Sequence, residues 1–213
     1  MRPEPTCPRC GGVLRAPGLW SSAWQCPVHG TVAPYSVYTR PGVEALEHVV
    51  KRATVPVWLP HGLSGWLISG FGCAGDERDG GRATVTSMTG PSPLGGAAEL
   101  LLVAEEPGIG LGARLAGLPG PDPGDGFGQG PPDAKLEAAG HPTALWNLPT
   151  GGDCAVFAGE AKARWLWALV WPASAGVVMY DAVSLVDLRD GYIDAELAFG
   201  SLSPRLSAVP AAH

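Results

Sequence analysis

The sequence predicts an α+β protein that is mainly β: a small N-terminal module, then a mostly antiparallel β domain with one or two short helices. Three observations support this class. Hydrophobic residues make up 46% of the 213 residues and charged residues only 16%, which is typical of a folded chain. The 31 glycines and 22 prolines indicate many turns and few long helices. Three cysteines and one histidine near the N-terminus have the spacing of metal ligands.

The chain is long for one ordinary domain, and its composition divides it into four parts. We expect the N-terminal module over residues 1–36, a linker and short helix over 37–60, the β domain over 61–206 and a disordered tail over 207–213. A β domain of about 150 residues buries enough apolar surface to fold without disulfides or metals.

The N-terminal module contains two copies of the motif Cys-Pro-x-(Cys or His)-Gly, with fifteen residues between Cys10 and Cys26. Together they supply Cys7, Cys10, Cys26 and His29. In each copy proline fixes one φ, and glycine permits a turn whose backbone amides point at the thiolates. Zinc prefers four nitrogen or sulfur ligands, and a purely structural site leaves no position for water or substrate. We therefore predict one structural Zn²⁺ ion bound by these four residues.

This stretch resembles a zinc ribbon, a module of two such turns and three strands, over about 25 residues. The resemblance implies contact with nucleic acid, docking to a protein partner, or stabilisation of a chain end. A nucleic-acid surface normally carries dense positive charge, and only Arg9 and Arg15 lie within this stretch. We therefore expect an unknown protein partner in preference to nucleic acid.

The net charge of −6 and the pI near 5.3 argue against nucleic-acid binding by the chain as a whole. The charge is uneven, because residues 1–52 contain six basic and three acidic side chains and the remainder is strongly acidic. No apolar run follows the N-terminal charge, and no segment approaches the ~18 apolar residues of a membrane helix. We expect a cytoplasmic protein without membrane contact, with Cys73 and Cys154 as free buried thiols.

Apolar residues recur three and four positions apart from residue 43, which predicts a short amphipathic helix over 43–53. Residues 120–132 predict a long surface loop. In the segment 163–172, Trp165, Trp167 and Trp171 alternate with apolar residues, so both faces of this strand should be buried. The tryptophans favour a core, with a ligand cleft as the alternative. The expected strands are 65–70, 82–88, 99–106, a hairpin over 135–146, 153–160, 163–172, 177–180 and 183–188.

Two glycine clusters could hold a ligand. The first, at Gly70, Gly72 and Gly75, matches the dinucleotide fingerprint in letters only, because a charged hairpin tip and not a helix follows it. In the second, an apolar strand leads into Gly108, Gly110, Gly112 and Arg114, a pattern able to hold an anion on backbone amides. Close packing of a strand against a turn explains the second cluster equally simply, and we favour it.

A resemblance extends over nearly the whole chain. The motifs that carry it lead us to identify an uncharacterised zinc-ribbon-containing family of high-GC Gram-positive bacteria. They are residues 7–12, 15–19, 24–26, 29–31, 55–58, 90–91, 93–96, 164–167 and 187–190. The resemblance implies no established activity. Relatives are sometimes labelled phosphotransacetylase, but the chain is too short for that enzyme and contains no recognisable acyl- or phosphoryl-transfer motif.

We expect a non-enzymatic, zinc-binding protein that acts by binding or protein interaction. The sequence contains no nucleophile elbow, paired-carboxylate motif, Walker loop or HExxH helix. Two alternatives remain. One is a small-molecule-binding protein or an acyl- or phosphoryl-transfer enzyme that uses the loop over 108–114. The other is nucleic-acid binding through the zinc ribbon.

Overall fold

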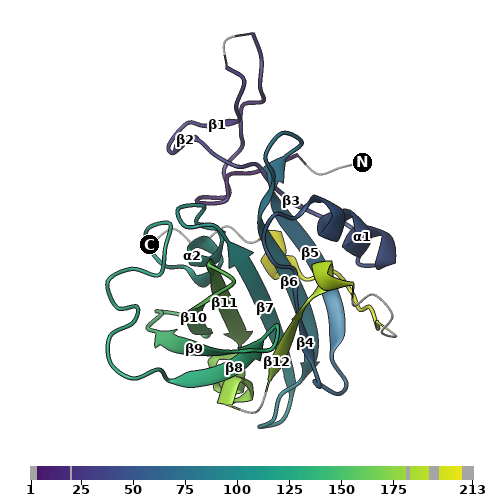
Figure 1. Cartoon of the computed structure of the whole chain (residues 1–213), viewed down its shortest axis with the longest axis vertical. Helices are drawn as coiled ribbons and strands as arrows, with labels where there is room; N and C mark the ends of the chain where they lie inside the picture. Colours follow the sequence, from purple (N-terminus) through teal and green to yellow (C-terminus); the bar gives the residue numbers. More distant parts are fainter. Residues whose placement is uncertain (1–3, 20, 181–182, 192–196, 208–213) are drawn as a thin grey trace.

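The computed structural model describes residues 4–19, 21–180, 183–191 and 197–207, and it confirms a mainly β fold. A small part of the chain, purple in Figure 1, projects from one end of a larger β body. It contains the two-stranded sheet of β1 (Gln25–Cys26) and β2 (Gly30–Thr31). The body contains α1 (Val43–Arg52), close to the predicted helix, and the short α2 (Leu111–Ala116).

Ten strands form one sheet in the order β3-β5-β6-β7-β11-β10-β9-β8-β12-β4. Every neighbouring pair is antiparallel except β8 and β12, which run parallel. The strands are β3 (Tyr35–Val37), β4 (Trp58–His61), β5 (Leu67–Asp76), β6 (Gly80–Pro91), β7 (Ala97–Glu105), β8 (Ala134–Ala138), β9 (His141–Leu148), β10 (Ala155–Ala161), β11 (Arg164–Trp171) and β12 (Ser184–Asp187).

The disordered tail expected over residues 207–213 lies almost wholly outside the described residues.

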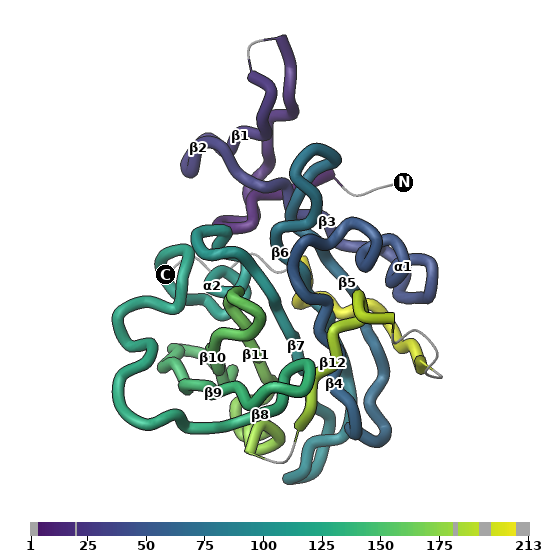
Figure 2. The backbone as a smooth tube through the Cα atoms, viewed as in Figure 1, coloured from purple at the N-terminus to yellow at the C-terminus, as the bar shows by residue number. Residues whose placement is uncertain are grey.

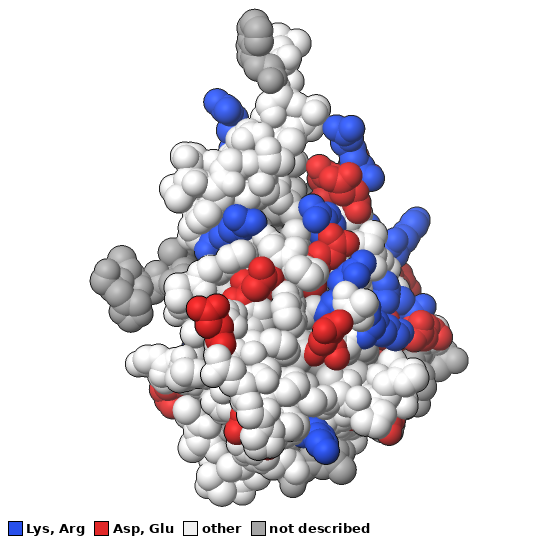
Figure 3. Space-filling view, turned by 60° about the vertical axis from the view of Figure 1, so that its left-hand side comes forward, with Lys and Arg blue, Asp and Glu red and all other residues white. Residues whose placement is uncertain are grey.

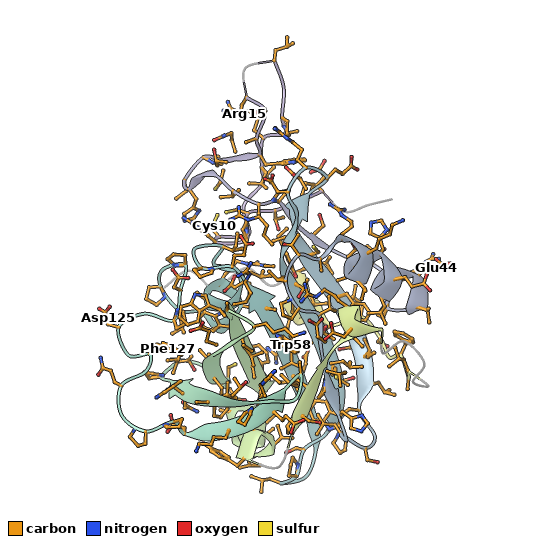
Figure 4. All side chains as sticks on the ribbon, in the orientation of Figure 1. Cys10, Arg15, Glu44, Trp58, Asp125 and Phe127 are labelled. Carbon is orange, nitrogen blue, oxygen red and sulfur yellow. The ribbon has the colours of Figure 1, made fainter. Side chains whose placement is uncertain are left out.

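The sheet curls until its β4 end approaches β6 (Figure 2). The segment that leads into β4 bonds to β6 directly: the Thr54 amide donates to the Gly81 carbonyl over 2.9 Å, and the Thr84 hydroxyl donates to the Pro56 carbonyl over 2.6 Å. One face of the sheet therefore encloses a core, with Trp58 fully buried near its centre (Figure 4).

Strands β7 and β11 are buried on both faces, as predicted for the segment 163–172. In β7, Leu100 and Leu102 point into the enclosed core, and Leu101 and Val103 point into a second core on the other face. Trp167 in β11 is fully buried in that second core, which α2 covers. Apolar residues in alternation on both faces explain why these segments read as continuous hydrophobic runs.

Two expectations about local structure are wrong. Residues 177–180 do not form a strand, because a 3₁₀-helix runs over Ala173–Tyr180. Its buried residues Ala175, Val178 and Met179 follow a helical spacing instead of alternation. The segment 71–75, expected as part of a loop, continues strand β5 to Asp76.

The glycines in β5 and β6 create room for neighbouring side chains. A Cβ atom on Gly72 would lie 2.6 Å from the Tyr35 Oη, and one on Gly81 would lie 2.5 Å from the Cys73 Sγ. Both distances are shorter than any normal contact, so only glycine fits.

The predicted hairpin tip between β5 and β6 is present, and Cys73 and Cys154 are free buried thiols, as expected. Within the described ranges, no helix is long and apolar enough to cross a membrane.

Asp187 connects the end of β12 to the segment before β4 and to the β10–β11 turn. Its carboxylate accepts hydrogen bonds from the Val57 amide (3.1 Å), Lys162 Nζ (2.9 Å) and Arg189 Nη2 (2.7 Å), and the residue is 2% exposed. Burial alone would raise the pKa of Asp187, but these donors lower it to about 2. The carboxylate therefore stabilises the fold above its ordinary pKa of 3.8, and this contribution is lost as the pH falls through about 2.

We expect Asp187→Asn to lower the free energy of unfolding at pH 7 by about 3 kcal/mol, because it leaves two cations beside a buried neutral group. Urea denaturation measures this loss. The matched control is Asp190→Asn, since Asp190 also pairs with Lys162 but its side chain is 65% exposed. The control should cost less than about 1 kcal/mol. The difference between wild type and Asp187→Asn should shrink from pH 4 to pH 2, and equal losses in both variants would contradict the assignment.

Candidate metal centre

The two Cys-Pro-x-(Cys or His)-Gly motifs form matching turns. In the first, the Gly11 amide donates to the Cys7 carbonyl and the Cys7 amide to the Gly12 carbonyl, each over 2.8 Å. Gly11 and Gly30 occupy the same place in the two turns, with φ of 70° and 68°. This left-handed conformation strongly favours glycine, which explains why both motifs end in it.

These turns bring Cys7, Cys10, Cys26 and His29 together, with all four donor atoms within 4.8 Å of one another. The Nδ1 atom of His29 lies 3.5 Å from the Sγ atoms of both Cys7 and Cys26, and the Sγ atoms of Cys10 and Cys26 are 3.8 Å apart. A tetrahedral ion bound at about 2.3 Å to sulfur and 2.1 Å to nitrogen requires edges of about 3.8 Å and 3.6 Å. Three of the six distances match these edges, and the four donor atoms lie close enough together to bind a metal ion.

The electrostatics of the cluster also favour a cation. The Cys7 side chain is fully buried, and this burial raises its pKa to about 12, despite the nearby backbone N–H groups of Arg9 and Cys10. Burial also opposes ionisation of Cys26, but the N–H groups of Val28 and His29 lower the pKa of Cys26 to about 6. The turns therefore direct backbone dipoles at the sulfur atoms, and a bound cation would displace the remaining protons.

The cluster lies at the base of the projecting part, next to the body. Figure 4 shows Cys10 close to α2, whereas Arg15 lies towards the far tip. We call residues 4–34 the Cys/His module. Thr6 and Tyr35 exchange two backbone hydrogen bonds of 2.8 Å, which join the module to the edge of the large sheet. Arg9, between the two cysteines of the first turn, donates from Nη2 to the Gly108 carbonyl over 2.5 Å.

The glycine cluster of the sequence analysis is thus part of the contact between module and body. The Gly108 amide donates to the Asp122 carboxylate over 2.8 Å, and the same oxygen accepts from the Trp165 indole over 2.8 Å. A Cβ atom on Gly110 would lie 2.9 Å from the Arg9 Cγ. The loop is closely packed on both sides, in agreement with the packing explanation.

The backbone amides at the start of α2 donate hydrogen bonds to a carboxyl group of the protein itself, that of Glu105. The Glu105 oxygens accept from the Leu111 amide (2.7 Å) and the Gly112 amide (3.1 Å). The sequence analysis missed this role of Glu105, although an acid at the end of an apolar strand was a visible signal. Gly112 also leaves space for the indole of Trp167, since a Cβ there would lie 2.3 Å from its Nε1 atom. Ligand binding by Gly108, Gly110, Gly112 and Arg114 stays a prediction.

Arg114 is only 4% exposed, and its guanidinium lies 5.1 Å from the centre of the Tyr35 ring. Burial lowers the pKa of Arg114, whereas Tyr35 and the Cys7 and Cys10 thiols raise it. The positive charge of Arg114 therefore lies buried against the Tyr35 ring.

A cleft of about 1030 Å³ opens where the module meets α1 and the β5–β6 hairpin. Aromatic, proline and charged side chains line it, among them Trp24, Tyr38, Arg40, His48 and Arg78. A smaller cleft of about 320 Å³ shares Trp24 with it and reaches Arg9 and Ile109. On the face shown in Figure 3, acidic and basic groups are intermixed, and the module carries few charges.

Glu105 provides a test of the packing at the start of α2. It is fully buried, and burial raises its pKa to about 8 against the lowering effect of the Leu111 and Gly112 amides. Its contribution to stability is therefore complete below its ordinary pKa of 4.5 and is lost as the pH rises through about 8.

We expect the free energy of unfolding to fall between pH 4.5 and pH 8, and Glu105→Gln to remove most of this slope. Chemical denaturation at several pH values measures it. Glu106→Gln is the matched control, because the neighbouring Glu106 is partly exposed and pairs with Arg82. The control should keep the wild-type slope, and an unchanged slope in Glu105→Gln would show that Glu105 is not the titrating group.

No match was found among the curated proteins or among the solved structures. One family model matches almost the whole chain, from the first residue to the last described helix, and so includes the cluster of Cys7, Cys10, Cys26 and His29. By this match over residues 1–206, the chain belongs to the family described as "Family of unknown function (DUF6758)".

Proposed function

We propose that this protein binds one structural Zn²⁺ ion in a zinc ribbon and acts in the cytoplasm by binding a protein partner, not by catalysis. The observation that carries the proposal is the closed set of four donors. Three sulfur atoms and one nitrogen within 4.8 Å of one another favour zinc over the hard cations Mg²⁺ and Ca²⁺, which prefer oxygen. Four protein ligands leave no position at which substrate could bind the ion.

The size of the Cys/His module supports a structural role for zinc. Within its described residues, the hydrophobic cluster has three buried members, Cys7, Leu14 and Cys26, and two of these are ligands. Strands of two residues and so small a core cannot offset the conformational entropy of the segment. Zinc binding would supply the missing free energy, as it does in other small metal-folded modules.

The large cleft supports a protein partner. Its lining mixes apolar, aromatic and charged side chains, which is typical of surfaces that bind protein segments. The module also exposes Val13 (72%), Leu19 (99%) and Val28 (78%). Arg9 is directed at the Gly108 carbonyl, so Arg15 is left as the basic side chain of the module that points outward. This arrangement favours protein over nucleic acid.

The enzymatic alternative has less support. The amides of Gly108, Leu111 and Gly112 already bond to Asp122 and Glu105, so the loop over 108–114 offers them to no phosphate or acyl oxygen. The label phosphotransacetylase gains nothing from this geometry. The resemblance over the whole chain leads us to propose a high-GC Gram-positive origin for the family.

We expect protein purified without chelator to contain about one zinc ion per chain by elemental analysis, with ~90% lost in Cys10→Ser, because three ligands bind zinc far more weakly. Cys73→Ala is the matched control, since Cys73 is buried in the body and lies outside the cluster. It should keep the metal. A metal-free wild type whose thermal stability does not respond to chelator would contradict the proposal.

We expect a photoreactive amino acid at Thr39, an exposed residue of the cleft, to cross-link one defined protein in native cells. The same group at Leu94, which is 67% exposed and lies in the β6–β7 turn, is the control position. Gel analysis and mass spectrometry identify the adducts. Identical adducts from both positions, or no adduct from Thr39, would contradict partner binding at the cleft.

A further inference from the structure

Strand β3 forms one edge of the ten-stranded sheet, so β5 pairs with only one of its sides. In an antiparallel pair, every second residue directs its N–H and C=O groups away from the partner strand. The Pro34 carbonyl and the Tyr38 amide both bond to β5, so positions 34, 36 and 38 face that strand. Tyr35 and Val37 therefore direct their backbone groups towards the outer edge.

The outer edge of β3 is paired at Tyr35 and open at Val37. Tyr35 exchanges two backbone hydrogen bonds of 2.8 Å with Thr6, which shows that this edge accepts a further strand. Among the described residues, none bonds to the N–H or C=O group of Val37. Unpaired groups at a sheet edge are a template for pairing with another chain. The edge at Val37 is thus open to an extended segment that would continue the pairing begun by Thr6.

This open edge lies on the wall of the large cleft, between the module and α1 (Figure 1), where residues 36–39 all line it. The cleft volume of about 1030 Å³ is at the upper end of the ~300–1,000 Å³ that holds whole small molecules, so a short peptide fits. Two half-buried rings, those of Trp24 and Tyr38, also line the cleft, and the Tyr38 ring lies 5.6 Å from that of His48. The cleft therefore offers backbone groups and apolar surface together.

We propose that β3 binds an extended peptide segment of the partner protein as an added strand, through the backbone of Val37. This inference rests on the proposed function, because the segment belongs to the partner that binds at the cleft. In this mode, backbone hydrogen bonds supply affinity and pockets for alternate side chains supply specificity. The rings of Trp24 and Tyr38 favour a segment with apolar side chains at alternate positions.

The probe is a random peptide library displayed on phage and selected on the full-length protein, and fluorescence anisotropy measures the affinities of the enriched peptides. We expect Val37→Pro to weaken their binding by about 10-fold or more, because a peptide carbonyl loses its donor. Proline is tolerated in an edge strand where the missing N–H faces outward, so the variant should fold. Val37→Thr is the matched control, because it keeps the N–H and the β-branched shape, and it should change the affinity less than about 3-fold.

A scan of N-methylated peptides tests strand pairing without a change in the protein. Methylation removes one peptide N–H at a time, and in a paired strand only every second residue faces β3. We expect methylation to abolish binding at a residue whose two neighbours tolerate it. Loss of binding at consecutive residues, equal binding of the peptides to wild type and Val37→Pro, or no enriched peptide would overturn the inference.

Hydrogen exchange of wild type supplies a further readout. The Val37 amide should exchange rapidly in the free protein while the Tyr38 amide is protected, and bound peptide should slow exchange at Val37 at least about 10-fold. A Val37 amide that is already protected in the free protein would overturn the inference, because this chain or a second copy would then cover the edge. In each of these cases a cross-link from Thr39 to one protein would still support the proposed function, so the two failures are distinguishable.

Discussion

The buried side chain of Tyr35 is the point at which the parts of this protein meet. Its backbone pairs with Thr6 on one side and with Ala74 of β5 on the other, so one residue continues the large sheet into the Cys/His module. Its hydroxyl donates to the Leu206 carbonyl over 2.9 Å, which fixes the short 3₁₀-helix Pro204–Ser207, and Arg114 covers its ring. Because these contacts converge on one residue, Tyr35 helps to orient the module on the body.

The space that large packed side chains require explains several glycines whose sequence pattern resembles a ligand-binding motif. Gly72 makes room for the Tyr35 ring, Gly110 for Arg9, and Gly112 for Trp167. In each case the missing Cβ lets a large side chain from a distant segment approach the backbone. The abundance of glycine in this chain therefore reflects, at these positions, the close packing of large side chains on a strongly curled sheet.

The metal cluster and the strands buried on both faces could be predicted from sequence because their determinants are local. Cys7 and Cys10 lie in one turn, and the alternation around Trp167 is visible within eight residues. The junction could not be predicted, since Arg9 and Gly108 are 99 positions apart and no local pattern connects them. The 3₁₀-helix over Ala173–Tyr180 was missed because its residues are almost uniformly apolar, which conceals the period that distinguishes helix from strand.

Among the described residues, two carboxyl groups and one guanidinium are deeply buried, in Asp187, Glu105 and Arg114, and they meet the cost of burial differently. Asp187 keeps its charge by pairing with Lys162 and Arg189, whereas Glu105 gives up its charge over most of the accessible pH range. Arg114 keeps its charge, because a guanidinium does not release its proton in proteins, and its guanidinium lies against the Tyr35 ring. Metal binding would stabilise module and body together, because the turn that binds the ion also directs Arg9 at the Gly108 carbonyl on the wall of the smaller cleft.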